Sequence, residues 1–378
     1  MKVGFVSFHS FSRPGGVKRH IMGLAAEFKR RGIEIKIIVP KREKNEKYGK
    51  DVILLGSSLP VNFAGTQGDL FLNLDFAKMS RVLEKEKFDV LHFHNFGFPS
   101  AFEVLEKSDA VNVLTFHANL EKNDFLENVP GLMYAFNKLI QRKMMGVIGV
   151  APFNLDAFKY YDGLKAVIPN GIDLDEFKPL RSRYTQFDDG KVNIFFLGRI
   201  EERKGLMYLL KAYKILDRKY KDKIRLIVGG EGPLKKECQD YVSENNLSNV
   251  VFVGPVLEKD APDYYRACDI YCSPAIYGES FGIVLIEAMA TGKPVVAYAN
   301  KGYKRVLEVG KGKRFSVKPK DVKNLALRLE ELIKSKRLRE EMGEWGLKES
   351  KNYAWSKVAD QVLAFYKECQ KRKESSNN

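Results

Sequence analysis

The sequence predicts an α/β protein made of two doubly wound domains, each built on a parallel sheet. Its 378 residues exceed what one hydrophobic core holds and suit two domains of roughly 150–200 residues each. Short apolar runs alternate with helical periodicity along the whole chain, an order typical of helices placed between parallel strands. The alternation restarts at residue 192, shortly after an Asn-Gly break at 170–171, so we expect the two domains to join near residues 168–180.

The expected elements follow one another in chain order. In the first half, we expect a helix from Val17 and strands at 2–8, 33–40, 88–95, 111–117, 146–153 and 165–171. In the second half, we expect helices near 204–219 and from 234, and strands at 192–200, 223–233, 249–256, 269–274 and 293–299. The residues from 371 onwards are read as a disordered tail. Doubly wound domains bind ligands at the C-terminal ends of their strands, and a substrate held by both would lie in a cleft between them.

The net charge narrows the range of partners. It is +16, from 64 basic and 48 acidic residues, which an anionic ligand, an anionic membrane or a solvated Lys/Glu surface would each explain. No nucleic-acid-binding motif is found, so no nucleic acid is expected as a partner. The four cysteines have no regular spacing, and neither a signal peptide nor a membrane-spanning run is recognisable. These features predict a cytoplasmic protein.

Two glycines follow the first strand. Gly15 and Gly16 precede the helix at Val17 and would let the backbone approach an anion at the helix N-terminus. The loop matches neither the dinucleotide fingerprint nor the P-loop, which argues against an oxidoreductase. An ordinary tight turn explains the two glycines equally well.

All five histidines lie in the first 117 residues. His92 and His94 share one face of a strand, and with His117 they would have the composition of a three-histidine metal site. We favour packing for His92, a cleft rim for His94 and the cleft itself for His117, which ends a strand. Asp173 and Asp175 have the D-x-D spacing of metal–diphosphate sites, but directly after Asn-Gly they favour a capping role. The sequence therefore predicts no bound metal.

In the stretch 278–290, GESFGIVLIEAMA, Glu279 precedes a short apolar run and Glu287 lies inside it. Ser280, Phe281 and Gly282 are expected to open a helix whose unpaired N–H groups favour a phosphate. Glu279 would then accept hydrogen bonds from sugar hydroxyls, and Glu287 from a ribose. A helix cap and a solvent-facing glutamate are the structural alternative.

Two cations follow the first strand of the second half. Arg199 lies at the strand end and Lys204 at the start of the next helix, where they would hold a diphosphate and neutralise a leaving group. Solvated charges on a loop are the alternative interpretation.

Three stretches of the chain occur in the order seen in a known protein family. The segments 198–205 (GRIEERKG), 168–177 (IPNGIDLDEF) and 278–296, with the E-x7-E spacing of Glu279 and Glu287, resemble the retaining glycosyltransferases of family 4. The segment 14–32 and the TFH at 115–117 are similar to bacterial phosphatidyl-myo-inositol mannosyltransferases. The resemblance implies the GT-B fold, with two Rossmann-like domains facing across a cleft. The acceptor domain would be 1–168, the donor domain 169–354, and a C-terminal helix at about 355–372 would cross back onto the first domain.

The resemblance also implies residue roles. His117 would contact the donor sugar and be needed for turnover, and Glu287 would bind the ribose. The catalytic set would be His117, Glu279, Arg199 and Lys204, and the donor set Gly15, Gly16, Arg199, Lys204, Glu279, Ser280, Phe281, Gly282, Ile283 and Glu287. Retention would follow from attack on the face that the leaving group departs from, without an enzyme nucleophile. No tightly bound cofactor is implied, and Mg²⁺ accompanying the donor is left open.

The acceptor side departs from the mannosyltransferase pattern. Its candidates are His9, Lys18, Asn95 and Lys122, but Lys18 replaces a Gln and Gly97 replaces a polar residue. Residues 68–87 would suit a membrane-docking helix, but core packing explains their apolar residues as well, and we favour core packing. Contact with the inner face of the cell membrane would then be peripheral.

The leading expectation is transfer of a hexose from a nucleotide sugar, mannose from GDP-mannose being favoured. The acceptor would be an inositol phospholipid or a related lipid or glycan. The open alternatives are a UDP- or ADP-sugar with a soluble sugar acceptor, a nucleotide-sugar epimerase of the same fold, a non-catalytic binding module, and a metal hydrolase using the histidines.

Overall fold

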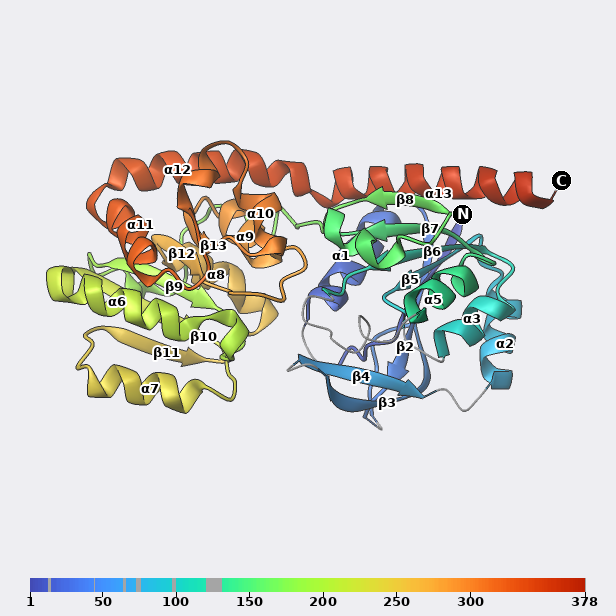
Figure 1. The fold of residues 1–378 in the computed structure, drawn as a ribbon, viewed down its shortest axis with the longest axis horizontal. Coiled ribbons are helices and arrows are strands. Elements are labelled where there is room, and N and C mark those ends of the chain that lie inside the picture. Colours follow the sequence, from blue (N-terminus) through green and yellow to red (C-terminus); the bar gives the residue numbers. More distant parts are fainter. Residues whose placement is uncertain are drawn as a thin grey trace. The chain divides into compact units, whose positions relative to one another are not determined.

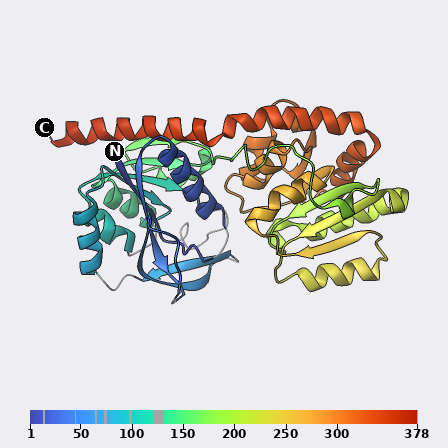
Figure 2. The ribbon, with the colours of Figure 1, turned by 180° about the vertical axis from the view of Figure 1, so that it is seen from behind.

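The computed structural model describes residues 1–12, 15–43, 45–63, 66–72, 76–96, 100–119 and 131–377. It divides into two compact units, drawn from opposite sides in Figures 1 and 2. Unit 1 comprises Met1–Gly171 and Trp355–Asn378, and unit 2 comprises Ile172–Ala354. Each unit contains a largely parallel sheet with helices on its faces, which confirms the predicted α/β fold class.

Unit 1 is built on an eight-stranded sheet of order β4-β3-β2-β1-β5-β6-β7-β8. Every pairing in it is parallel except that of β3 with β4. Its strands are β1 (Lys2–Ser7), β2 (Glu34–Lys41), β3 (Val52–Phe63), β4 (Thr66–Leu72), β5 (Val90–His94), β6 (Val111–Phe116), β7 (Met144–Gly149) and β8 (Leu164–Val167). The order reverses between β1 and β5, so the ligand-binding edge of this sheet is the one where those two strands end.

Helices cover both faces of this sheet. One face packs against α1 (Gly16–Arg30) and α13 (Trp355–Asn377), which lie side by side in Figure 2. The other packs against α2 (Phe76–Glu86), α3 (Ser100–Lys107), α5 (Leu132–Ile140) and the 3₁₀ turn η1 (Pro152–Phe158). Successive side chains of a strand point to opposite faces of its sheet. In β1, Phe5 therefore packs in the core under α1 and α13, and Val6 packs in the core on the opposite face.

Two expectations about unit 1 are wrong. Residues 68–87 do not form one helix, because the stretch up to Leu72 pairs antiparallel with β3. The helical part, α2, buries Met79 to 1% exposure, so core packing accounts for this apolar position. The C-terminal residues are helical to Asn377 rather than a disordered tail. Their cations reach unit 1 carbonyls: Arg372 donates to Asp162 at 3.2 Å, and Lys373 to Asp109.

Unit 2 is built on a six-stranded parallel sheet of order β11-β10-β9-β12-β13-β14. Its strands are β9 (Val192–Leu197), β10 (Ile224–Gly229), β11 (Val250–Gly254), β12 (Ile270–Ser273), β13 (Val295–Tyr298) and β14 (Ser316–Val317). Its helices are α6 (Leu206–Tyr220), α7 (Lys235–Glu244), α8 (Ala261–Ala267), α9 (Ile283–Ala290), α10 (Lys301–Leu307), α11 (Val322–Lys334) and α12 (Lys336–Ser350). Among the described residues of both units, no helix has the length and apolar character needed to span a bilayer.

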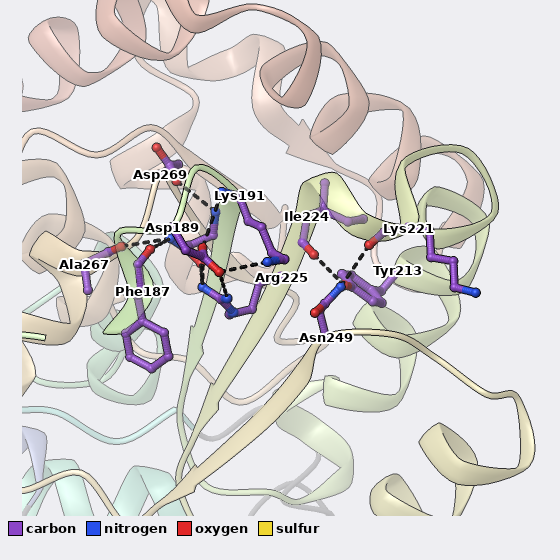
Figure 3. Close-up of polar contacts among 11 residues, drawn as sticks. Phe187, Asp189, Lys191, Tyr213, Lys221, Ile224, Arg225, Asn249, Ala267 and Asp269 are labelled. Carbon is purple, nitrogen blue, oxygen red and sulfur yellow. Dashed lines mark hydrogen bonds and ion pairs between the residues drawn. The ribbon is translucent and has the colours of Figure 1, made fainter. Parts of the chain in front are cut away.

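A polar network holds the start of the unit 2 sheet together (Figure 3). Arg225 on β10 donates to Asn193 on β9 at 3.0 Å and to Asp189 at 3.1 Å. The Asn193 amide donates to the Phe187 carbonyl at 2.7 Å, and its backbone N–H donates to Asp269 at 2.8 Å. The Arg225 guanidinium holds the pKa of the Asp189 carboxyl well below its ordinary value. The network thus ties β9 and β10 to the segments before β9 and β12.

The contact between α1 and α13 yields a stability prediction. A Cβ added at Gly23 would lie 2.2 Å from Cε2 of Trp355, a rigid indole that also packs on Gly171. Overpacking costs about 1–3 kcal/mol, and at so short a distance from a rigid ring we expect a cost above the roughly 1 kcal/mol that alanine gains over glycine in a helix. We therefore expect Gly23→Ala to lower the free energy of unfolding of unit 1, measured by urea denaturation. In a Trp355→Leu background the same substitution should stabilise, and a stabilising effect with Trp355 present would contradict the packing.

Candidate active site

Four buried histidines gather at the ligand-binding edge of the unit 1 sheet. His20 comes from α1, His92 and His94 from β5, and His117 directly follows β6. The rings of His92 and His94 stack with centroids 4.4 Å apart, and those of His94 and His117 stack at 5.5 Å. The His20 ring meets the His117 ring edge-on at 4.7 Å. Parallel neighbouring strands and the first helix therefore bring together residues that lie far apart in the sequence.

The polar partners of these rings differ. Both nitrogens of His92 are hydrogen-bonded, Nδ1 to the Tyr366 hydroxyl and Nε2 to the Thr115 hydroxyl, each at 2.6 Å. His20 Nδ1 lies 2.8 Å from Oδ1 of Asn170, and His94 Nδ1 lies 3.2 Å from Nε2 of His117. The Nε2 atoms of His20 and His94 are buried and have no hydrogen-bond partner among the described residues.

Burial determines the charge of this cluster. It lowers the pKa of His20 to about 4, against a smaller opposing effect of the Asn170 hydrogen bond. Burial and the neighbouring histidines likewise hold the pKa values of His94 and His117 well below the ordinary value. The imidazoles are therefore uncharged at neutral pH. His94, 0% exposed, is not at a cleft rim as expected, because its ring is enclosed by those of His92 and His117.

Asn95 connects His117 to a second candidate. Its Oδ1 accepts a hydrogen bond from the His117 backbone N–H at 2.7 Å, and its amide nitrogen lies 3.2 Å from Nε2 of His9. Asn95 has φ 61°, a left-handed conformation that Asn tolerates better than most residues. Lys18 donates to the Phe11 carbonyl at 2.9 Å, and Lys122 lies outside the described residues. The structure thus joins His9, Asn95 and His117 and gives Lys18 a different, local contact.

The glycine loop of unit 1 ends at the start of α1. Gly15 is the N-terminal cap residue of the helix and, having no side chain, makes no side-chain capping hydrogen bond to the first N–H groups. A Cβ added at Gly15 would have no atom within 4 Å among the described residues. The helix dipole and these N–H groups together favour an anion at this end of α1.

In unit 2, the carboxylate of Glu279 forms an ion pair with the ammonium of Lys204. Glu279 Oε1 accepts from Lys204 Nζ at 2.6 Å and from Arg203 at 3.0 Å. Burial raises the pKa of the Glu279 carboxyl, but the charges of Lys204 and Arg203 outweigh burial and hold the pKa below its ordinary value. Arg199 pairs with Glu201 at 3.2 Å and keeps a side chain that is 43% exposed. A charged carboxylate and two cations therefore meet at the C-terminal end of β9.

The backbone around Glu279 is held by close glycine contacts. A Cβ at Gly302, at the start of α10, would lie 2.2 Å from the carbonyl oxygen of Glu279. Gly282 caps α9 with φ 96° and approaches the Tyr303 ring, where a Cβ would lie 2.6 Å from Cδ1. Ser280 and Phe281 lie in the bend before the helix, which begins at Ile283 rather than at Ser280 as expected.

Glu287 lies one turn into α9 and is 1% exposed. Its Oε2 accepts a hydrogen bond from the Tyr265 hydroxyl of α8 at 2.8 Å. The helix cap and solvent-facing glutamate that were considered as alternatives are therefore wrong for Glu287, whose carboxylate is buried and oriented. The capping interpretation of Asp173 is confirmed, because its Oδ1 accepts from the backbone N–H groups of Asp175 and Glu176 at 2.9 and 3.1 Å.

The sequence interpretation missed several supporting residues. His20 lies on the buried face of α1 four residues before Leu24, so its helical spacing was the available signal. Arg203 and Tyr265 carried no signal in the sequence, because their roles depend on contacts with Glu279 and Glu287 across the fold. The same holds for Asn170, which bonds His20 over 150 positions.

Comparison with known proteins shows the family to which this chain belongs. Residues 14–176 match a family model described as Glycosyltransferase Family 4, and residues 178–349 match one described as Glycosyl transferases group 1. The chain is 32% identical to a phosphatidyl-myo-inositol mannosyltransferase of Mycobacterium leprae, over 97% of this chain and 96% of that protein. The chain belongs to the family 4 glycosyltransferases. This glycosyltransferase is also 30% identical to the mannosylfructose-phosphate synthase of Agrobacterium fabrum, over 65% of this chain and 58% of that protein.

Solved structures share the fold of this glycosyltransferase. A sucrose-phosphate synthase from Thermosynechococcus elongatus superposes with a TM-score of 0.74 at 19% identity, covering 97% of this chain and 98% of that one. A glycosyltransferase from Rickettsia africae gives a TM-score of 0.76 at 19% identity, covering 98% of each chain. These likenesses show the GT-B fold, with its two Rossmann-like domains.

Proposed function

We propose that this glycosyltransferase moves mannose from GDP-mannose to the inositol headgroup of a phospholipid, with retention of the anomeric configuration. The carboxylate–cation cluster of Glu279, Lys204 and Arg203 carries the proposal, because a diphosphate leaving group needs fixed positive charge beside the sugar. The choice of mannose and of an inositol lipid rests on the full-length similarity to phosphatidyl-myo-inositol mannosyltransferases.

We assign several residues to the nucleotide-sugar donor, beginning with those of unit 2. In unit 2, Arg199 and Lys204 hold the diphosphate, and Glu279 binds hydroxyls of the transferred sugar. The backbone from Ser280 to Ile283 at the capped start of α9 meets the adjacent phosphate, since Gly282 and the N-terminal N–H groups suit an anion. Glu287, oriented by Tyr265, binds the ribose.

In unit 1, we assign Gly15 and Gly16 at the start of α1 to the donor phosphates and His117 to the donor sugar. His9, Asn95 and Lys18 are proposed as acceptor contacts, together with Lys122. Asn95 supports this grouping, because it holds both the His117 backbone and the His9 ring.

The proposed reaction exchanges one bond at the anomeric carbon for another. The bond from C1 to the diphosphate oxygen breaks, a bond from C1 to the acceptor oxygen forms on the same face, and the acceptor proton passes to the departing phosphate. Lys204 and Arg199 neutralise the charge that grows on the diphosphate. Any Mg²⁺ would accompany the donor phosphates rather than reside in the protein. We further propose that the reaction takes place in the cytoplasm, at the inner face of the cell membrane, through peripheral contact.

The test is incubation of the full chain with GDP-, UDP- and ADP-sugars, each with phosphatidylinositol vesicles, with a soluble sugar phosphate, or with no acceptor. Mass spectrometry and NMR of the product should show a mannosylated inositol lipid from GDP-mannose with the anomeric configuration of the donor. A glycosylated sugar phosphate in place of the lipid would overturn the proposed acceptor. Conversion of a nucleotide sugar without acceptor would indicate an epimerase, and no product under any condition would overturn glycosyl transfer by these groups.

A further inference from the structure

We propose that His20, His94 and His117 form a binding site for one divalent transition-metal ion of the zinc class. One nitrogen from each ring can be chosen so that all three lie within 4.8 Å of one another. The trio considered from the sequence contained His92, but both nitrogens of His92 are already hydrogen-bonded. The third ring of the structural trio is instead that of His20 on α1, which contacts the rings of His94 and His117.

The nitrogens of these rings suit metal binding. His20 Nδ1 must donate its proton to Oδ1 of Asn170, an acceptor, so the unpartnered Nε2 carries a lone pair. A ligating histidine commonly donates its other N–H to such an oxygen, which fixes its tautomer and orientation. His94 Nε2 is likewise buried without a partner. A neutral imidazole has a lone pair on the ring nitrogen that carries no proton, so each of the three rings can offer one ligand atom.

The ligand set indicates the kind of ion. Imidazole nitrogen suits zinc, copper and nickel, whereas magnesium and calcium prefer oxygen ligands. Three histidines with an open fourth position are a known zinc arrangement, with zinc–nitrogen distances of about 2.0–2.1 Å. Binding would draw the rings closer and replace the hydrogen bond between His94 and His117. His117 is 8% exposed and His94 0%, so His117 marks the entry side of the site.

Occupancy of this site has a consequence that rests on the proposed function. If His117 contacts the donor sugar, the metal and the donor compete for its ring. Each ligand must then weaken the binding of the other by the same factor, because the coupling between two equilibria is reciprocal.

The site itself is tested without the donor. Untagged, chelator-treated full-length protein is titrated with Zn²⁺ by calorimetry and with Co²⁺ by visible absorption. We expect one equivalent to bind, with the Co²⁺ bands of nitrogen ligation and without thiolate charge-transfer bands. His20→Asn should weaken binding more than tenfold, and Asn170→Ala by roughly 10–100-fold, as for other partners of ligating histidines. His92→Asn, whose side chain is outside the ligand set, should stay within about threefold of the unmodified chain.

Several results would overturn the site. These are no stoichiometric binding to the unmodified chain, thiolate bands in the Co²⁺ spectrum, or a loss in His92→Asn as large as that in His20→Asn. If a variant fails to fold, imidazole NMR of the unmodified chain decides, because Zn²⁺ must shift His20, His94 and His117 and leave His92 nearly unchanged. The donor assignment is judged separately by measuring GDP-mannose affinity with and without Zn²⁺. Zinc binding with unchanged donor affinity would support the site and overturn the sugar contact of His117.

Discussion

Replacement of Lys204 by methionine should lower kcat/KM for glycosyl transfer by about 10²–10³-fold, the usual effect of removing one fixed donor to a developing negative charge. Lys204 Nζ lies 2.6 Å from Oε1 of Glu279 in a partly buried ion pair, so its ammonium is already oriented before the donor binds. Because charge on the diphosphate grows as the sugar departs, most of the loss should fall on kcat rather than on KM.

Steady-state kinetics with GDP-mannose measures this effect, and the melting temperature checks that Lys204→Met remains folded. Lys211→Met is the matched control, because Lys211 is an exposed residue of α6 whose ammonium lies 5.8 Å from the Tyr208 ring centre. The control should retain activity within about twofold. Equal activities of the two variants would remove Lys204 from the catalytic set.

Acidification should destabilise unit 1 selectively between pH 6.5 and 4. Burial lowers the pKa of His20 to about 4 and holds those of His92, His94 and His117 well below the ordinary value. Below pH 6.5 these histidines therefore bind protons in the unfolded chain but not in the folded chain, and unfolding becomes more favourable as the pH falls. Each such histidine contributes about 1.4 kcal/mol per pH unit over the interval in which only the unfolded form is protonated.

The chain provides its own control, because all five histidines lie in unit 1. Hydrogen exchange followed by mass spectrometry, corrected for the intrinsic effect of pH, should show β5 and β6 losing protection from pH 6.5 to 5. Protection of β9 and β10 in unit 2 should stay nearly constant over the same range. Parallel loss in both units, or none in β5 and β6, would contradict uncharged buried imidazoles.

Much of the architecture could be predicted because its causes are local. The apolar runs that became β1, β2, β5, β6, β9 and β10 lie in the sequence close to where the structure has them. The antiparallel pair β3 and β4 was missed, since its pairing is a long-range contact at the edge of the sheet that no short pattern marks. The C-terminal helix extends further than expected because Arg372 and Lys373 find carbonyl partners that are distant in sequence.

The site residues divide in the same way. Lys204 and Glu279 were predicted from the local sequence pattern, and the structure joins them in one ion pair. Arg203 and Asn170 could not be recognised, because each acts on a side chain more than 70 positions away, as Arg203 does on Glu279 across 76. His94 was placed wrongly, since strand alternation gives its face of the sheet but not the depth to which α1 and α13 cover that face.

The packing of α13 also bears on the order in which the protein becomes complete during synthesis. Val358, Val362 and Tyr366 belong to the core of unit 1, although they are translated after the whole of unit 2. Ile172–Ala354 is continuous in the chain and can close its core once it has emerged, whereas the strands of unit 1 must wait for α13, which follows unit 2. A chain that is cut short before Trp355 would therefore carry a finished unit 2 attached to an open unit 1 sheet, with the His92 imidazole lacking its Tyr366 partner.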